Sequence, residues 1–142
     1  MLMGWSAAGG SPADLHAILL AFFLFLWQVP HFWLLMLQHD GEYKTAGLPV
    51  VTDVFSSHQV RAITCSWLIA ASAASLLLLQ FRILTTLPSA LLLLFLSVSL
   101  VLLTINQFFI AKAKNFRLIF IAVNSYMLLV MAIVVIEKVF TI

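Results

Sequence analysis

Four long runs of apolar residues alternate with polar segments along the chain. The runs are Leu15–Leu37, Ala62–Leu79, Leu87–Ile105 and Leu118–Ile136. At a rise of about 1.5 Å per residue, a run of about 18 residues or more crosses a hydrocarbon core of about 30 Å. Because backbone groups in lipid must bond to one another, we expect these runs to be membrane-spanning helices. A membrane barrel would require alternating apolar and polar residues, which the runs lack.

Composition strengthens the membrane interpretation. Apolar residues make up 64% of the chain and charged residues only 8%, whereas soluble domains have about 45–50% and about 25%. So few charges cannot cover a water-facing surface, which excludes a soluble enzyme, a nucleic-acid binder and a disordered linker. The single cysteine, Cys65, excludes an internal disulfide and a cysteine-based metal site. The expected fold class is all-α, a polytopic membrane protein with about four transmembrane helices.

Basic residues in the polar connections predict the orientation in the membrane. The connections Gln38–Arg61 and Asn106–Arg117 would lie on one side, and Gln80–Thr86 on the other. Five basic residues, Lys44, Arg61, Lys112, Lys114 and Arg117, belong to the first side, and two, Arg82 and Lys138, to the second. Because basic loops stay in the cytoplasm, we expect the 38–61 loop to be cytoplasmic and both termini to lie across the membrane.

The first apolar run carries a stripe of polar residues. On a helix that advances about 100° per residue, Trp27, Gln28, His31 and Gln38 fall within a sector of roughly 100°. Polar groups within a membrane are costly and usually face a cavity or a partner. A lone histidine is more often a packing residue bonded to a neighbouring carbonyl, but the stripe leads directly into a charged loop, which favours a binding site.

The loop after this run offers oxygen ligands and a cation. Asp40 and Glu42 could hold Mg²⁺, which is commonly bound by one or two carboxylates together with substrate phosphates. Lys44 could pair with a phosphate as a point charge. Taken alone, two carboxylates in a polar loop are more often simply solvated.

Three sequence blocks resemble a known family. Gly4–Gly9 (GWSAAG), Leu26–Phe32 (LWQVPHF) and Glu42–Val50 (EYKTAGLPV) are similar, in order and spacing, to the second half of the protoheme IX farnesyltransferases (haem O synthases). These belong to the UbiA-type intramembrane prenyltransferases. The resemblance covers roughly Gly4–Pro49, and the remaining runs match only in number and apolar character.

The resemblance implies a bundle of nine transmembrane helices around a cavity that opens toward the cytoplasm. It also implies transfer of a farnesyl group from farnesyl diphosphate to a vinyl group of haem B, which gives haem O. In that family Mg²⁺ holds the diphosphate through two polar, acidic motifs on cytoplasmic loops. The implied location is the cell inner (cytoplasmic) membrane, and the implied partners are the two substrates and the lipid bilayer.

Site residues follow from the matching blocks. The resemblance assigns Glu42, Tyr43 and Lys44 to the second loop motif as catalytic residues, with Glu42 as a metal ligand. It assigns Trp27, Gln28, His31 and Phe32 to substrate binding in the cavity. The family usually has aspartate where Glu42 stands, so the carboxylate is kept with a longer reach. Asp40 has no clear counterpart, and we expect it to serve as the second metal ligand.

The first acidic motif of the family does not occur in this chain. We therefore expect residues 1–142 to be the C-terminal portion of the prenyltransferase domain, inactive alone and completed by an N-terminal half or a complementary chain. Two alternatives stay open. One is a non-catalytic four-helix membrane subunit or haem-carrying assembly protein. The other is a UbiA-type enzyme that uses a quinone precursor or chlorophyllide, although the block around His31 favours haem.

Overall fold

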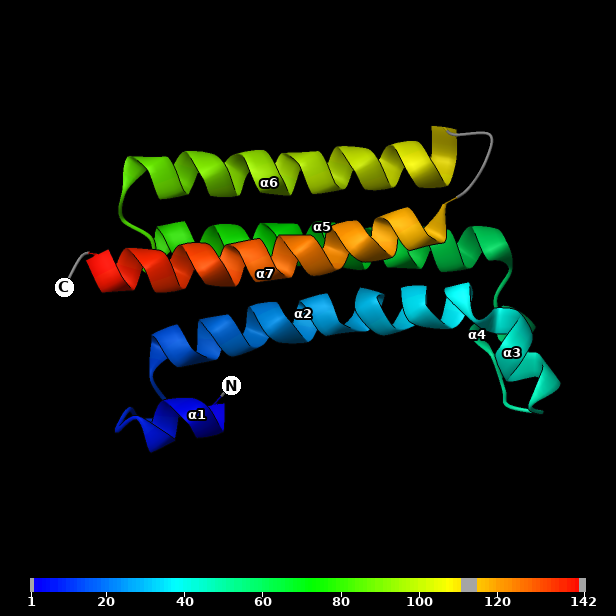
Figure 1. Ribbon diagram of the computed structural model, residues 1–142, viewed down its shortest axis with the longest axis horizontal. Coiled ribbons are helices and arrows are strands. Elements are labelled where there is room, and N and C mark those ends of the chain that lie inside the picture. Colours follow the sequence, from blue (N-terminus) through cyan, green and yellow to red (C-terminus); the bar gives the residue numbers. More distant parts are fainter. Residues whose placement is uncertain (1, 111–114, 141–142) are drawn as a thin grey trace.

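The computed structural model describes residues 2–110 and 115–140. Four long helices run side by side along the molecule (Figure 1): α2 (Leu15–Gln38), α5 (Ser57–Gln80), α6 (Leu87–Ile105) and α7 (Phe116–Phe140). By length and composition each of them, or nearly all of it, is a candidate membrane span. No strand occurs within the described ranges. The all-α, multi-pass membrane fold predicted from the sequence is therefore confirmed.

The four long helices form an up-down-up-down bundle. Helix α2 packs on α5 and α7, and α6 packs on the same two helices from the opposite side. Figure 1 shows that α2 and α6 end, and α5 and α7 begin, at one end of the bundle. The α5–α6 turn, the start of α2 and the end of α7 lie at the other end. We call these the loop end and the terminal end.

Shorter helices and shifted boundaries distinguish the structure from the sequence pattern. The short helix α1 (Leu2–Ala7) precedes α2, while α3 (Asp40–Thr45) and α4 (Val51–Val54) lie within the connection expected to be one long loop. A π-helical segment, η1 (Asn106–Ile110), continues α6. Helix α5 begins at Ser57, before the apolar run, because Ser56 and Gln59 cap it reciprocally with bonds of 3.3 and 2.8 Å.

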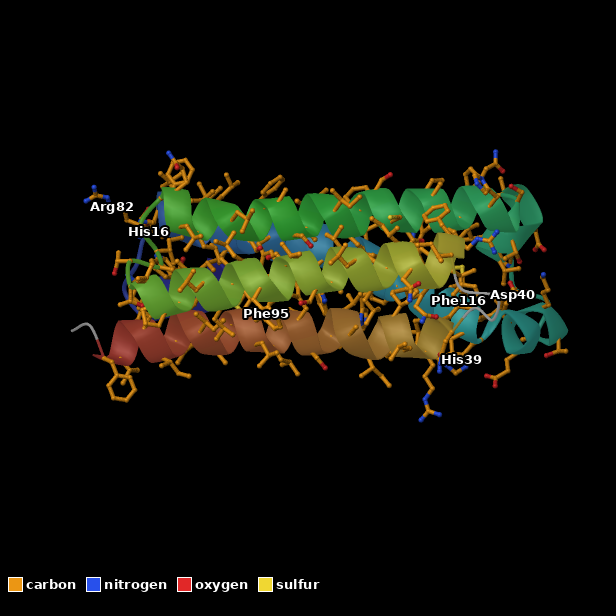
Figure 2. The ribbon with its side chains drawn as sticks, turned by 90° about the horizontal axis from the view of Figure 1, so that it is seen from above. His16, His39, Asp40, Arg82, Phe95 and Phe116 are labelled. Atoms are coloured by element: carbon orange, nitrogen blue, oxygen red, sulfur yellow. The ribbon has the colours of Figure 1, made fainter. Side chains whose placement is uncertain are left out.

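The bundle is apolar both inside and outside. Each long helix contributes fully buried side chains to the interior, among them Phe23, Leu68, Leu93 and Val130. Large apolar side chains also remain exposed around the outside, such as Phe25, Phe95 and Leu128 at 57%, 67% and 64% exposure, and Phe95 points outward from α6 in Figure 2. An outer surface of this kind fits contact with lipid rather than water.

A buried carboxylate ties α7 to the turn at the terminal end. Glu137 is only 4% exposed. It accepts hydrogen bonds from the backbone N–H and the hydroxyl of Thr85, and from those of Thr86 at 3.0 and 3.1 Å. Thr86 is the N-cap residue of α6, where free N–H groups and the helix dipole favour a negative charge.

Candidate functional site

Two short helices at the loop end are joined through one carboxylate. Asp40, at the start of α3, accepts a hydrogen bond from Lys44 Nζ at 2.9 Å and another from Thr52 Oγ1 of α4 at 2.5 Å. Lys44 also lies 3.8 Å from Asp53 Oδ1. Since Asp40 uses one oxygen for each bond, it holds its own helix and α4 together.

These hydrogen bonds also stabilise the charged forms of the pair. The bonds from Thr52 and Lys44 hold the pKa of Asp40 below its usual value of 3.8. The bond to Asp40 raises the pKa of Lys44 above its usual value of 10.5. Asp40 is therefore an anion and Lys44 a cation across the neutral range. Lys44 thus retains the charge that a phosphate would require.

Glu42 and Tyr43 line a hollow at the loop end. This hollow, of about 380 Å³, lies between the end of α2 and α3, and its walls include His39, Glu42 and Tyr43. The Glu42 side chain is 82% exposed, and its Oε2 lies 3.3 Å from Nδ1 of His39. A carboxylate, a phenol and an imidazole thus face one water-accessible space.

The two predicted metal ligands are engaged separately. Glu42 contacts His39, whereas Asp40 contacts Lys44 and Thr52. Residues two apart on a helix do not face each other. Within residues 2–110 and 115–140, no group of three or more histidine, cysteine, aspartate and glutamate side chains comes together. A metal here would need oxygen atoms from a substrate or from another segment.

Farther along α2, Trp27 and His31 face α7. Trp27 Nε1 donates a hydrogen bond of 3.0 Å to the carbonyl oxygen of Val123. The His31 ring lies 4.8 Å from the Trp27 ring and 5.1 Å from the Phe120 ring, both at about 33–34°. His31 Nδ1 is buried without a hydrogen-bond partner. The bond to a neighbouring carbonyl, which the alternative interpretation of a packing histidine would require, is therefore not made at this nitrogen.

Gln28 and Phe32 do not share this environment. Gln28 is exposed and borders a hollow of about 430 Å³ between α1 and α2. Phe32 is 52% exposed, although its ring contacts that of His31 edge-on at 5.4 Å. The four predicted substrate-binding residues therefore divide into a pair against α7 and a pair on the surface of α2.

Sequence reasoning missed three residues that shape these environments. Phe120 and Val123 of α7 contact His31 and Trp27 across more than 80 positions of the chain, and no local signal predicts such a contact. Thr52 also carries no sequence signal, because its hydrogen bond to Asp40 forms only when the chain folds back and places α4 against α3. The aromatic neighbourhood of His31 is therefore a property of helix packing.

Curated proteins related to this chain share one description. The protoheme IX farnesyltransferase of Geobacter sulfurreducens is 45% identical over 84 residues, covering 56% of this chain and 30% of the relative. That of Alkalihalophilus pseudofirmus is 35% identical over 91 residues, covering 64% and 29%. That of Aquifex aeolicus is 46% identical over 50 residues, covering 35% and 17%. The matched part of the chain thus spans 30% or less of each of these relatives.

The family comparison covers most of the described helices. No solved structure matches the chain. The model of the UbiA prenyltransferase family matches residues 1–124, a range that includes α1 to α6 and the part of α7 that contacts His31 and Trp27. The chain therefore belongs to the UbiA prenyltransferase family.

Proposed function

We propose that this chain supplies the second acidic motif and part of the haem-binding wall of an enzyme that makes haem O. The enzyme transfers a farnesyl group from farnesyl diphosphate to a vinyl group of haem B. The observation that carries this proposal is that one helix, α2, holds His31 among aromatic side chains and ends at the hollow lined by His39, Glu42 and Tyr43. The printed names of the relatives support the choice of substrates.

In this proposal the loop end receives the diphosphate. Lys44 is a cation held between two carboxylates, so it can exchange Asp40 for a phosphate oxygen. Tyr43 lines the same hollow as Glu42 and can donate its hydroxyl to the diphosphate. Positive charge and donors at this position would stabilise the negative charge that develops on the leaving group.

Because the two carboxylates do not face each other, each would contribute separately to magnesium shared with the substrate. Glu42 offers an exposed carboxylate whose contact in the structure is a single histidine nitrogen. Asp40 offers a second carboxylate once Lys44 moves to the phosphate. Mg²⁺ is commonly held by one or two carboxylates plus substrate phosphates, and when bound it supplies charge neutralisation to the diphosphate. Glu42 and Asp40 are therefore the proposed magnesium ligands of this chain.

The proposed porphyrin-binding and cation-stabilising residues lie along α2. His31 has a nitrogen without a partner, and imidazole is a common ligand of haem iron and a donor to polar groups. The faces of Trp27 and Phe32 can stabilise the allylic cation that forms when the diphosphate leaves. Gln28 faces a separate hollow beside α1, and we propose that it contacts the porphyrin from that side.

We further propose that the activity requires a segment with the first acidic motif, on the same or a separate chain, in the cell inner membrane. Such a segment would supply the oxygen ligands that Asp40 and Glu42 alone do not complete.

Haem O formation in a complemented strain tests the function. The chain would be co-expressed with the part of the Geobacter sulfurreducens enzyme that precedes its matched region, in bacteria without their own protoheme IX farnesyltransferase. We expect extracted haem to contain haem O by chromatography and mass spectrometry, and none from the chain alone. The relative's own second part, supplied separately, is the positive control. If it restores haem O and this chain does not, although present in the membrane, the non-catalytic subunit is favoured.

A further inference from the structure

Hydroxyl groups gather inside the bundle, away from the site described above. Tyr126 of α7 shares hydrogen bonds with Ser75 of α5 at 2.5 Å and with Ser97 of α6 at 2.9 Å. The two serine hydroxyls lie 3.3 Å apart, and Ser75 also donates to the carbonyl oxygen of Ser72 at 2.7 Å. These three buried hydroxyls satisfy one another, as polar groups in a hydrocarbon environment must.

Ser72 is the exception in this group. Its side chain is only 4% exposed, and its Oγ has no hydrogen-bond partner. The Tyr126 hydroxyl lies nearby, but hydrogen-bond geometry is met only with Ser75 and Ser97. Leaving a buried hydroxyl unpaired destabilises the fold, so its location calls for an explanation.

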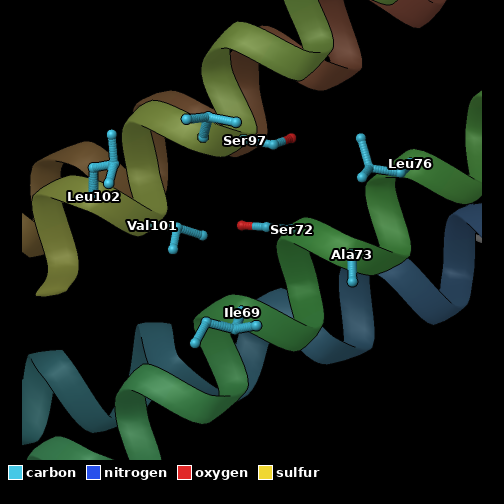
Figure 3. A pocket seen from close by; sticks show the side chains of 8 residues that line it. Ile69, Ser72, Ala73, Leu76, Ser97, Val101 and Leu102 are labelled. Carbon is cyan, nitrogen blue, oxygen red and sulfur yellow. The ribbon is translucent and has the colours of Figure 1, made fainter.

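The unpaired hydroxyl points into a groove between α5 and α6. Figure 3 shows the Ser72 oxygen directed from α5 toward α6. The groove has a volume of about 270 Å³ and an apolar accessible lining. Three of its wall residues, Ile69, Val98 and Leu102, are 45%, 56% and 62% exposed, so the groove opens on the outer surface of the bundle. A cavity of about 150 Å³ already accommodates benzene.

The depth of Ser72 limits what can reach it from the lipid. It lies 15 residues after Ser57 and 8 residues before Gln80, the ends of α5. At about 1.5 Å per residue it is at least ~12 Å from either end of the helix, within the hydrocarbon layer. A charged or zwitterionic headgroup does not enter this layer at low cost, whereas an uncharged hydroxyl or carbonyl group on a long chain does.

We propose that the α5–α6 groove binds a neutral lipid, with an apolar chain along the groove and an uncharged hydroxyl or carbonyl oxygen bonded to Ser72 Oγ. This site is separate from the loop end and from His31, and it does not rest on the proposed function. The ligand class follows from the apolar walls, the opening toward lipid and the unpaired hydroxyl of Ser72 within the membrane span.

Photolabelling of the full chain in phosphatidylcholine nanodiscs tests this site. The probe is a long-chain primary alcohol with a diazirine in its chain, and the matched probe is the same chain without the hydroxyl. We expect the alcohol to label the segments around Ile69 and Val98 at saturable low concentration. Ser72→Ala should reduce that labelling about three- to tenfold, the factor expected for one hydrogen bond. Labelling by the matched probe should be weaker and unaffected by the substitution.

Two control variants separate binding from folding. Ser66→Ala removes an exposed serine on the same helix and should leave labelling unchanged. Val98→Trp fills the groove from an exposed position and should abolish labelling by both probes. Because Ser72→Ala removes an unpaired hydroxyl, its melting temperature should be equal to or above that of the parent chain. If Ser72→Ala fails to fold, the loss or persistence of labelling in Val98→Trp tests whether the groove is the binding site.

The proposal is overturned by any of four results. These are equal labelling by the two probes in the parent chain, full labelling of Ser72→Ala, full labelling of Val98→Trp, or no labelling of the groove at all. The last result would mean that another helix or a second copy of the chain covers it.

Discussion

At the scale of single residues, His31 of α2 and Glu42 of α3 differ in their surroundings. His31 has a buried nitrogen, and its ring lies beside those of Trp27 and Phe120. Glu42 is an almost fully exposed carboxylate beside a hollow. Gln38, the last residue of α2, lies seven residues beyond His31, which is roughly 10 Å along a helix. We therefore expect the side chains of His31 and Glu42 to contact different substrates.

Substitutions of these residues should fail in different ways in the complemented enzyme. Glu42→Gln removes a charged oxygen ligand, so we expect a rate loss of roughly 10²–10³ that excess Mg²⁺ partly restores. His31→Ala should weaken haem B binding, and added Mg²⁺ should not help. The measurements are the rate as a function of Mg²⁺ concentration and the haem affinity by optical titration. Phe95→Leu, on the outer surface of α6, is the control that should change neither.

A shared response of the two variants would contradict this division. If both show the same rescue by Mg²⁺ and unchanged haem affinity, then His31 acts in folding or at the diphosphate. If His31→Ala loses haem affinity and Glu42→Gln does not, the assignment of α2 to haem and α3 to the diphosphate is supported.

At the scale of elements, the contact between α3 and α4 should depend on pH. The pKa of Asp40 is held below 3.8 by Thr52 and Lys44. Its contribution to the stability of the α3–α4 contact is therefore present above pH 3.8 and is lost as the pH falls through the lowered pKa. Lys44, whose pKa is raised, keeps its contribution until the pH exceeds 10.5. We expect spin labels at Ala46→Cys and Val54→Cys to keep a narrow distance distribution at neutral pH and to broaden in acid.

Two asparagine variants distinguish the role of Asp40 from that of Asp53 in the spin-label experiment. Asp40→Asn should give a broad distribution at every pH, because both bonds to α3 and α4 use that carboxylate. Asp53→Asn should retain the acid transition, since Asp53 lies 3.8 Å from Lys44 whereas Asp40 lies at 2.9 Å. A transition that persists in Asp40→Asn would show that another group controls the contact.

Another element-scale expectation concerns α7 and the α5–α6 turn. Glu137→Ala leaves the N–H groups and hydroxyls of Thr85 and Thr86 without this acceptor. Thr85 is exposed and Thr86 is half-buried, so water can replace part of these hydrogen bonds, each of which contributes about 1.5–3 kcal/mol when the acceptor is charged. We expect a loss of about 2–4 kcal/mol in unfolding free energy in detergent. The neighbouring exposed Lys138→Ala should change it by less than about 0.5 kcal/mol.

The helices also show which features of the fold the apolar pattern of the sequence predicts and which it does not. Apolar runs predicted the four long helices because hydrophobic length is a strong local signal. They missed the first turns of α5, where His58 and Arg61 interrupt the run, although the cap formed by Ser56 and Gln59 starts the helix there. The positions of Phe120 and Val123 beside α2 could not be predicted, since they depend on how α7 is rotated in the bundle.

At the scale of the whole molecule, the bundle places its charged groups at opposite ends. Asp40 and His39 mark the loop end in Figure 2, and Arg82 marks the terminal end. Three basic residues also lie at the loop end: Lys44 in α3, Arg61 near the start of α5 and Arg117 near the start of α7. Lys112 and Lys114, which complete the predicted five-to-two basic excess, lie outside the described residues. The positive-inside rule predicts a cytoplasmic loop end, where soluble diphosphates would be available.

Cysteine labelling in intact cells tests this orientation. Ala46→Cys lies exposed at the loop end and Ala13→Cys at the terminal end, while the native Cys65 is buried and serves as the unlabelled background. We expect a membrane-impermeant maleimide to modify Ala13→Cys in cells with a permeabilised outer membrane. Ala46→Cys should react only in inverted vesicles. The reverse pattern would place Lys44 and Glu42 outside the cytoplasm, and a diphosphate site at α3 would then be untenable.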